Sequence, residues 1–179
     1  MVKVGITCVL LAIILALIPC LPALARDTGT ITITMTGVDE ISIAITLEPT
    51  EWYIGDIAAD MERKTSPPIE WCILTNTGNV DIDTFIEGED AKWVDNPGAY
   101  KWMLSSDGTN GEDTYGLWFR ISGDTARGYV PVTKAESEFW PYIEPVQHKQ
   151  FGLKLLTPTS FDADKQMQTH IIISAVAAS

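Results

Sequence analysis

Two acidic stretches carry the side chains best suited to bind a metal ion. The turn SSDGTNGED contains Asp107, Asn110, Glu112 and Asp113, and the stretch DIDTFIEGED contains Asp81, Asp83 and Asp90. Oxygen ligands on a tight, glycine-containing loop are what Ca²⁺ prefers. The first stretch lacks the full EF-hand spacing, so a solvated acidic turn is the competing interpretation. Ca²⁺, held by either set, is the one cofactor that the sequence predicts.

Six tryptophans could instead build a binding surface for carbohydrate. Trp71 and Trp118 lie in apolar, strand-like runs and are expected in the core, whereas Trp93, Trp102 and Trp140 flank loops and are expected to be exposed. Exposed aromatic rings stack on sugars, but the same rings also fill β-sheet cores. A carbohydrate-binding module is therefore the alternative function.

Catalysis has little support in the sequence. His148 and His170 are the only histidines, and neither has a recognisable catalytic neighbourhood. No nucleophile elbow, phosphate-binding loop, dinucleotide-binding glycine pattern or zinc-protease motif is present. Cys8 and Cys20 belong to the expected N-terminal signal, and Cys72 with two scattered histidines gives no zinc-ligand spacing. We expect a protein that is not an enzyme.

The N-terminus has the pattern of a secretory signal. Residues 1–25 combine Lys3, an apolar run from Cys8 to Ile18, and the small-residue site Ala23-Leu24-Ala25. A retained membrane anchor and a lipoprotein signal at Cys20 are the alternatives, and Pro19 beside that cysteine disfavours the second. We expect cleavage after residue 25, no membrane attachment afterwards, and a secreted, extracellular or cell-surface location for residues 26–179.

The expected mature chain is acidic and has no disulfide. Its 154 residues suit one domain, and loss of Lys3 changes the net charge from −12 to −13. Such a surface disfavours nucleic acid and anionic lipid as partners. Cys72, the remaining cysteine, lies in an apolar run and is expected to be buried and inert. The fold must then depend on its core, on bound ions or on neighbouring molecules.

Alternating apolar residues and frequent turn residues predict an all-β domain. We expect a single antiparallel β-sandwich, Ig-like or jelly-roll, of about eight or nine strands. The expected strands are Gly29–Thr36, Ile41–Leu47, Ile69–Thr75, Val80–Glu87, Trp102–Leu104, Thr114–Ile121, Gly128–Thr133, Lys149–Leu156 and Met167–Ala177. Only Ile57–Lys64 and Lys134–Glu138 carry a trace of helical periodicity.

Parity along the expected strands predicts the core. The apolar residues that we expect on the buried face are Ile31, Ile33, Ile43, Ile45, Trp71, Ile73, Phe85, Trp118, Leu153, Leu155, Ile171 and Ile173.

The segment RDTGTITITMTG would be the first part of the mature chain. Thr30, Thr32 and Thr34 alternate there with Ile31, Ile33 and Met35, which gives one hydroxylated and one apolar face. This strand could pair with Ile41–Leu47 through the GVDE turn, leaving a monomer. It could equally be donated to a neighbouring copy, and repeated donation would build a filament. The expected partners are accordingly the chain itself or other cell-surface components.

The stretch LTNTGNVDIDTFIEG, with its strand, NTGN turn and second strand, resembles a hairpin of Ig-like domains in bacterial and archaeal surface proteins. FGLKLLTPTSF looks like the return strand of such a sandwich. With the signal and the acidic single domain, the chain resembles the TasA/camelysin-like fibre subunits and the archaeal cannula and bundling-pilus proteins. That resemblance implies a sandwich that polymerises by donating its N-terminal strand, in some members with Ca²⁺ at the contacts.

Overall fold

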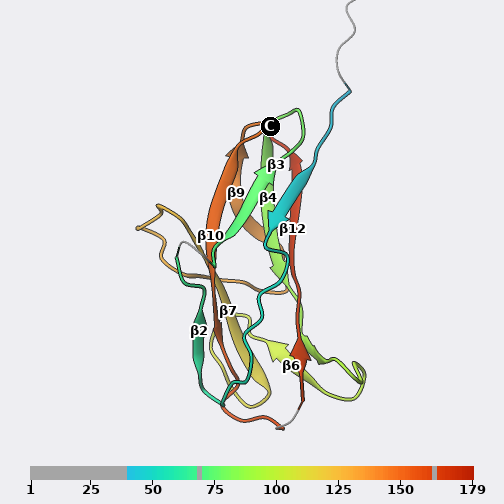
Figure 1. The fold of residues 1–179 in the computed structure, drawn as a ribbon, viewed down its shortest axis with the longest axis vertical. Coiled ribbons are helices and arrows are strands. Elements are labelled where there is room, and N and C mark those ends of the chain that lie inside the picture. Colours follow the sequence, from blue (N-terminus) through green and yellow to red (C-terminus); the bar gives the residue numbers. More distant parts are fainter. Residues whose placement is uncertain (1–39, 68–69, 163–164) are drawn as a thin grey trace, which may run out of the picture. The chain divides into compact units, whose positions relative to one another are not determined.

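A computed structural model describes residues 40–67, 70–162 and 165–179 (Figure 1), which belong to one compact unit, Asp39–Ser179. The expected signal segment and the expected strand Gly29–Thr36, with Ile31 and Ile33, lie outside the described residues. Within the described ranges, no helix is long and apolar enough to cross a membrane.

The described part of the chain is all-β, as the sequence predicts. Its strands are β1 (Ile45–Glu48), β2 (Glu62–Lys64), β3 (Cys72–Asn76), β4 (Ile82–Gly88), β5 (Ala91–Trp93), β6 (Lys101–Leu104), β7 (Thr114–Ile121), β8 (Val130–Pro131), β9 (Ser137–Ile143), β10 (His148–Leu156), β11 (Met167–Gln168) and β12 (Ile171–Ala177). The two traces of helical periodicity are misleading. Residues 57–64 form a turn followed by β2, and residues 134–138 bend into β9.

The larger sheet has nine strands around a central pair. Its main order is β1-β3-β10-β7-β6-β5-β11, with β2 added to β10 and β8 added to β7. β7 and β10 pair over six residues, from Gly116 with Leu156 to Ile121 with Phe151. β6 pairs with β7 in parallel, so the sheet is mixed and the expectation of a purely antiparallel fold is wrong at this pair.

The smaller sheet has the order β12-β4-β9. β12 pairs with β4 over seven consecutive residues without a break, whereas the β4–β9 register shifts twice. The expected single strand Met167–Ala177 is divided between the sheets, since β11 joins β5 and β12 joins β4. In Figure 1, β4 and β12 run side by side along the unit, as this register requires.

One hydrophobic core joins the two sheets. Phe139 of β9 makes edge-to-face contacts with Phe119 of β7 and Phe151 of β10, with ring centroids 5.0 and 4.9 Å apart. Ile82 and Ile86 of β4 are fully buried in the same cluster as Leu74 of β3. Cys72 is buried there as a free thiol, which confirms its predicted burial.

The predicted core is right at some strands and has the wrong parity at others. Leu153 and Leu155 are buried, and Ile45, Ile171 and Ile173 pack against the core. The corrections concern Ile43, Trp71, Ile73, Phe85 and Trp118: Ile43 is exposed, and the other four are only half-buried on the opposite faces of their strands.

On β3 and β7, the parity errors arise because both faces of the strand carry large apolar side chains. On β7, Leu117 and Phe119 take the buried face, and Trp118 takes the other. There Lys154 lies 3.7 Å from the centroid of the Trp118 ring, a cation–π contact. Alternation alone does not distinguish a core face from a face covered by neighbouring loops.

Candidate functional site

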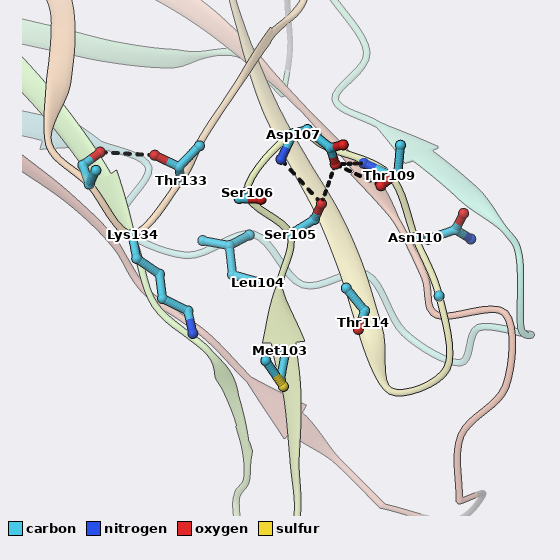
Figure 2. Close-up of a pocket in the computed structure, with 12 residues that line it drawn as sticks. Met103, Leu104, Ser105, Ser106, Asp107, Thr109, Asn110, Thr114, Thr133 and Lys134 are labelled. Carbon is cyan, nitrogen blue, oxygen red and sulfur yellow. Dashed lines mark hydrogen bonds between the residues drawn. The ribbon is translucent and has the colours of Figure 1, made fainter.

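The Asp107 loop is organised by its own hydrogen bonds. One carboxylate oxygen of Asp107 accepts from the Thr109 hydroxyl at 2.6 Å, from the Thr109 N–H at 2.9 Å and from the Ser105 hydroxyl at 2.9 Å (Figure 2). These bonds, with the Thr109 hydroxyl first, lower the pKa of Asp107 to about 2. The carboxylate therefore closes a local turn, as short polar side chains commonly do.

This loop borders an open hollow of about 730 Å³. Figure 2 shows Asp107, Thr109 and Asn110 on one side and Lys134 on the other, with Met103 and Leu104 between them in this view. Lys134 forms an ion pair with Asp90 at 2.6 Å. The hollow therefore presents mainly loop hydroxyls and methylene groups, and the described residues that line it include no histidine or cysteine.

The other predicted calcium ligands of this loop are used elsewhere. Asn110 donates to Asp60 at 2.9 Å and to the Thr157 carbonyl at 2.8 Å, while Asp113 accepts from the Tyr100 hydroxyl. Glu112 is exposed and forms a bridge with Ser160 through the main chain.

The second predicted set is not one cluster. Asp81 and Asp83 lie at the start of β4, where Asp83 accepts from the Tyr142 N–H at 2.9 Å. Asp90 lies beyond the other end of that strand, so the expected grouping with Asp81 and Asp83 is wrong. There the Lys134 ammonium and the Leu104 N–H hold the pKa of Asp90 below its ordinary value although burial opposes this. Among the described residues, no three His, Cys, Asp or Glu side chains gather as a metal site. Calcium binding stays a prediction, and melting with and without EDTA checks it.

The three candidate tryptophans do not behave alike. Trp102 is only 5 % exposed and packs against Phe161, so its expected exposure is wrong. Trp93 and Trp140 are half-buried, and each lies under a lysine, Lys165 and Lys149 respectively. Trp93 belongs to the larger sheet and Trp140 to the smaller one. Residue type and flanking loops could not reveal these packing differences.

The strongest candidate site is one that the sequence did not single out, the open edge of β12. This strand reads IIISAVA, contains no charge and no proline, and is the last strand of its sheet among the described residues. Ile171, Ile173 and Ala175 point toward the core, yet they are only partly buried. Ile86 and Thr84 of β4, which pair with Ile173 and Ala175, are 0 % exposed. The core is therefore less completely covered along β12.

The hydrogen-bonding direction of β12 follows from its two ends. The Ala178 N–H donates to the Asp81 main-chain carbonyl, and the His170 carbonyl accepts from the Glu89 N–H. The even-numbered residues of β12 therefore direct their main-chain groups to β4. Successive residues of a strand point their main-chain groups to opposite sides. Ile171, Ile173, Ala175 and Ala177 therefore direct their N–H and C=O groups to the open edge, where the described chain supplies no main-chain partner.

Other sheet edges in the described ranges are short or interrupted. β1 has four residues and is followed by Pro49, β2 is Glu-Arg-Lys, and β8 contains Pro131. β9 contains Pro141 and has an irregular register with β4. Prolines, charges and bulges protect edges from pairing with other chains. β12 has none of these features.

Comparisons of the chain with known protein families, characterised proteins and solved structures find no match.

Proposed function

We propose that this chain is an exported structural protein of the cell surface or extracellular matrix, folded as one β-sandwich, that assembles into filaments. Each copy donates its N-terminal strand, Gly29–Thr36, to the open edge of β12 in the next copy. The proposal extends the resemblance to fibre subunits, and its main support is the unprotected edge of β12.

The shared core supports the proposed sandwich. Side chains from both sheets meet in one cluster, with Phe139 between the rings of Phe119 and Phe151. Two sheets that bury their inner faces against each other form a sandwich. The short parallel pair β6–β7 is a local addition to this arrangement.

The donated strand suits the edge in length and pattern. β12 pairs through seven residues, and Thr30–Thr36 also has seven. Ile31, Ile33 and Met35 would extend the apolar layer beside Ile171 and Ile173, while the threonines would face water. Main-chain hydrogen bonds would supply affinity, and the apolar side chains would supply register. Donation from one copy to the next does not close on itself and gives a filament.

Deletion of residues 27–36 tests the proposal. The truncated chain should remain folded by circular dichroism, lose assembly in sedimentation, and bind a labelled peptide of residues 27–38. The same peptide with its residues in scrambled order is the control. If the strand instead completes its own sheet, the truncated chain unfolds, and strand donation is then rejected.

A carbohydrate-binding module is the second candidate function, and the half-buried Trp93 and Trp140 are its remaining aromatic residues. Binding of soluble polysaccharide is measured for the unchanged chain and for a Trp140→Ala variant. Binding that is lost in the variant supports the carbohydrate function, since strand donation does not require this ring.

A further inference from the structure

Exposed apolar side chains gather at one end of the unit. Ile41 is 68 % exposed, Tyr142 57 % and Val146 82 %, and Ile43 is also exposed. We call these four residues the apolar tip.

Hydrogen bonds bring the tip residues to the β3–β4 turn. The Val146 N–H donates to the Asn76 carbonyl, and the Thr77 N–H donates to the carbonyl of Ala44, next to Ile43. The Tyr142 N–H donates to Asp83 at 2.9 Å. Two segments far apart in the sequence thus present apolar side chains around one turn.

Two tip residues have unfavourable backbone conformations. Tyr142 has φ +54° and Val146 has φ +61°, the left-handed region that glycine and asparagine tolerate best. A β-branched residue in this region is uncommon, and such strain concentrates at functional sites. Burial in the described core does not explain either side chain, because both are more than half exposed.

The donated strand must leave from this same end. The Glu40 carbonyl accepts from the Asn79 side chain at 2.8 Å, which fixes Glu40 at the β3–β4 turn. Only Gly37, Val38 and Asp39 lie between Thr36 and Glu40. Four Cα–Cα steps reach at most about 14 Å. A copy that holds this strand must therefore lie against the end that carries the tip.

We propose that the apolar tip is the surface by which each donor copy packs against the copy that accepts its strand. This inference rests on the proposed strand donation. Because only three residues connect the donated strand to Glu40, the donor and acceptor copies must also touch at the donor's tip. The partner is a second copy of this chain, and burial of the tip stabilises the filament in addition to the strand. Strand pairing alone would leave these apolar side chains in water.

Matched double variants test the tip. Tyr142→Asn with Val146→Asn removes two tip side chains and keeps residues that tolerate positive φ. Val94→Ser with Met103→Gln is the control, since these side chains are also exposed but belong to the chain beyond the far end of β4. Melting measurements first establish that both variants fold.

Two readouts on the mature chain, residues 26–179, separate this inference from strand donation. Sedimentation measures the concentration for half-assembly, and disulfide formation between Thr34→Cys on one copy and Ser174→Cys on another reports strand capture. We expect the tip variant to need at least tenfold more protein to assemble, while the control does not, and to form the disulfide once assembled. Unchanged assembly of the tip variant with a normal disulfide overturns the tip alone. Absence of the disulfide in the otherwise unchanged protein, also when the acceptor cysteine is placed at Ile172 or Val176 instead of Ser174, overturns strand donation and the tip with it.

Discussion

Asp107 shows how one side chain can organise a loop through hydrogen bonds from its neighbours. Its pKa is lowered to about 2 by hydrogen bonds from Thr109 and Ser105, so the folded state favours the ionised carboxylate. An unfolded aspartate has a pKa of about 3.9. The stabilisation is present above that value and is lost as pH falls toward 2.

Replacement of Asp107 by Asn therefore has a pH-dependent effect. We expect Asp107→Asn to lower Tm at pH 6 by a small amount, and the difference from the unchanged protein to shrink as pH falls from 4 to 2. Melting curves at several pH values measure this. A difference that stays constant across that range would mean that the ionised carboxylate does not hold the loop.

Val146 allows stability and assembly to be separated. A non-glycine residue in the left-handed region destabilises the folded state by roughly 1–2 kcal/mol. Glycine removes this strain, but the higher conformational entropy of its unfolded chain offsets part of the gain in stability. We expect Val146→Gly to raise Tm by roughly 2–3 °C in thermal melts. The same variant should assemble less well, because a tip side chain is lost. A fall in both properties would show that Val146 serves the fold instead.

At the scale of elements, Asn76 joins three parts of the fold. Its buried side chain donates to the Val80 and Ile143 carbonyls at 2.8 and 2.9 Å and accepts from the Gly78 N–H at 2.9 Å. Loss of these bonds leaves buried polar groups without partners, which typically costs about 1–3 kcal/mol for each group.

We expect Asn76→Ala to lower the free energy of unfolding by about 2–4 kcal/mol, as measured by urea denaturation. Asn79→Ala is the matched control, because the Asn79 bonds to Ser42 and Glu40 are exposed. Its cost should stay near or below about 1 kcal/mol. Equal effects of the two substitutions would contradict a special role of the buried amide.

Proline substitutions test the direction of the β12 edge. The Ala175 N–H points to the open edge, whereas the Val176 N–H points to β4 by the same alternation. Proline is tolerated where no ladder hydrogen bond is lost. We expect Ala175→Pro to fold but to stop assembly, and Val176→Pro to be strongly destabilised. Assembly of a folded Ala175→Pro protein would exclude this edge as the acceptor.

Several elements could be read from the sequence, and others depended on tertiary context. Thr114–Ile121 was predicted with its observed bounds, because polar turns flank an apolar run. β9 was missed since Pro141 interrupts its pattern, and the division of Met167–Ala177 depends on which sheet each half joins. The β12 edge could not be predicted as a site. Whether a strand is central or at an edge is decided by the other strands.

At the scale of the whole molecule, charge should oppose assembly. The expected mature chain carries a net charge of −13, and copies of one sign repel each other. Repulsion between surface charges reaches over about 30 Å at 0.01 M salt but only about 10 Å at 0.1 M, because added salt screens it. We expect the protein concentration for half-assembly to fall several-fold when salt is raised from 0.01 M to 0.1 M, as measured by sedimentation. A rise with salt would indicate that ion pairs, rather than strand addition and apolar contact, hold the copies together.

Disulfide trapping between copies tests strand donation most directly. The expected mature chain contains only the buried Cys72, so one introduced cysteine per chain is specific. Neighbouring strands bring facing Cβ atoms to about 4.5–5.5 Å, close to the separation that a disulfide requires. Thr34→Cys is mixed with chains that carry Ile172→Cys, Ser174→Cys or Val176→Cys, which covers three registers on the outer face of β12.

Donation predicts a disulfide-linked pair of different chains for at least one of the three mixtures, with the linked peptides identified by mass spectrometry. A chain carrying both cysteines should then form ladders of linked copies. If the double variants instead form the bond only within single chains, and no mixture links two copies, the N-terminal strand completes its own sheet and the filament account is contradicted.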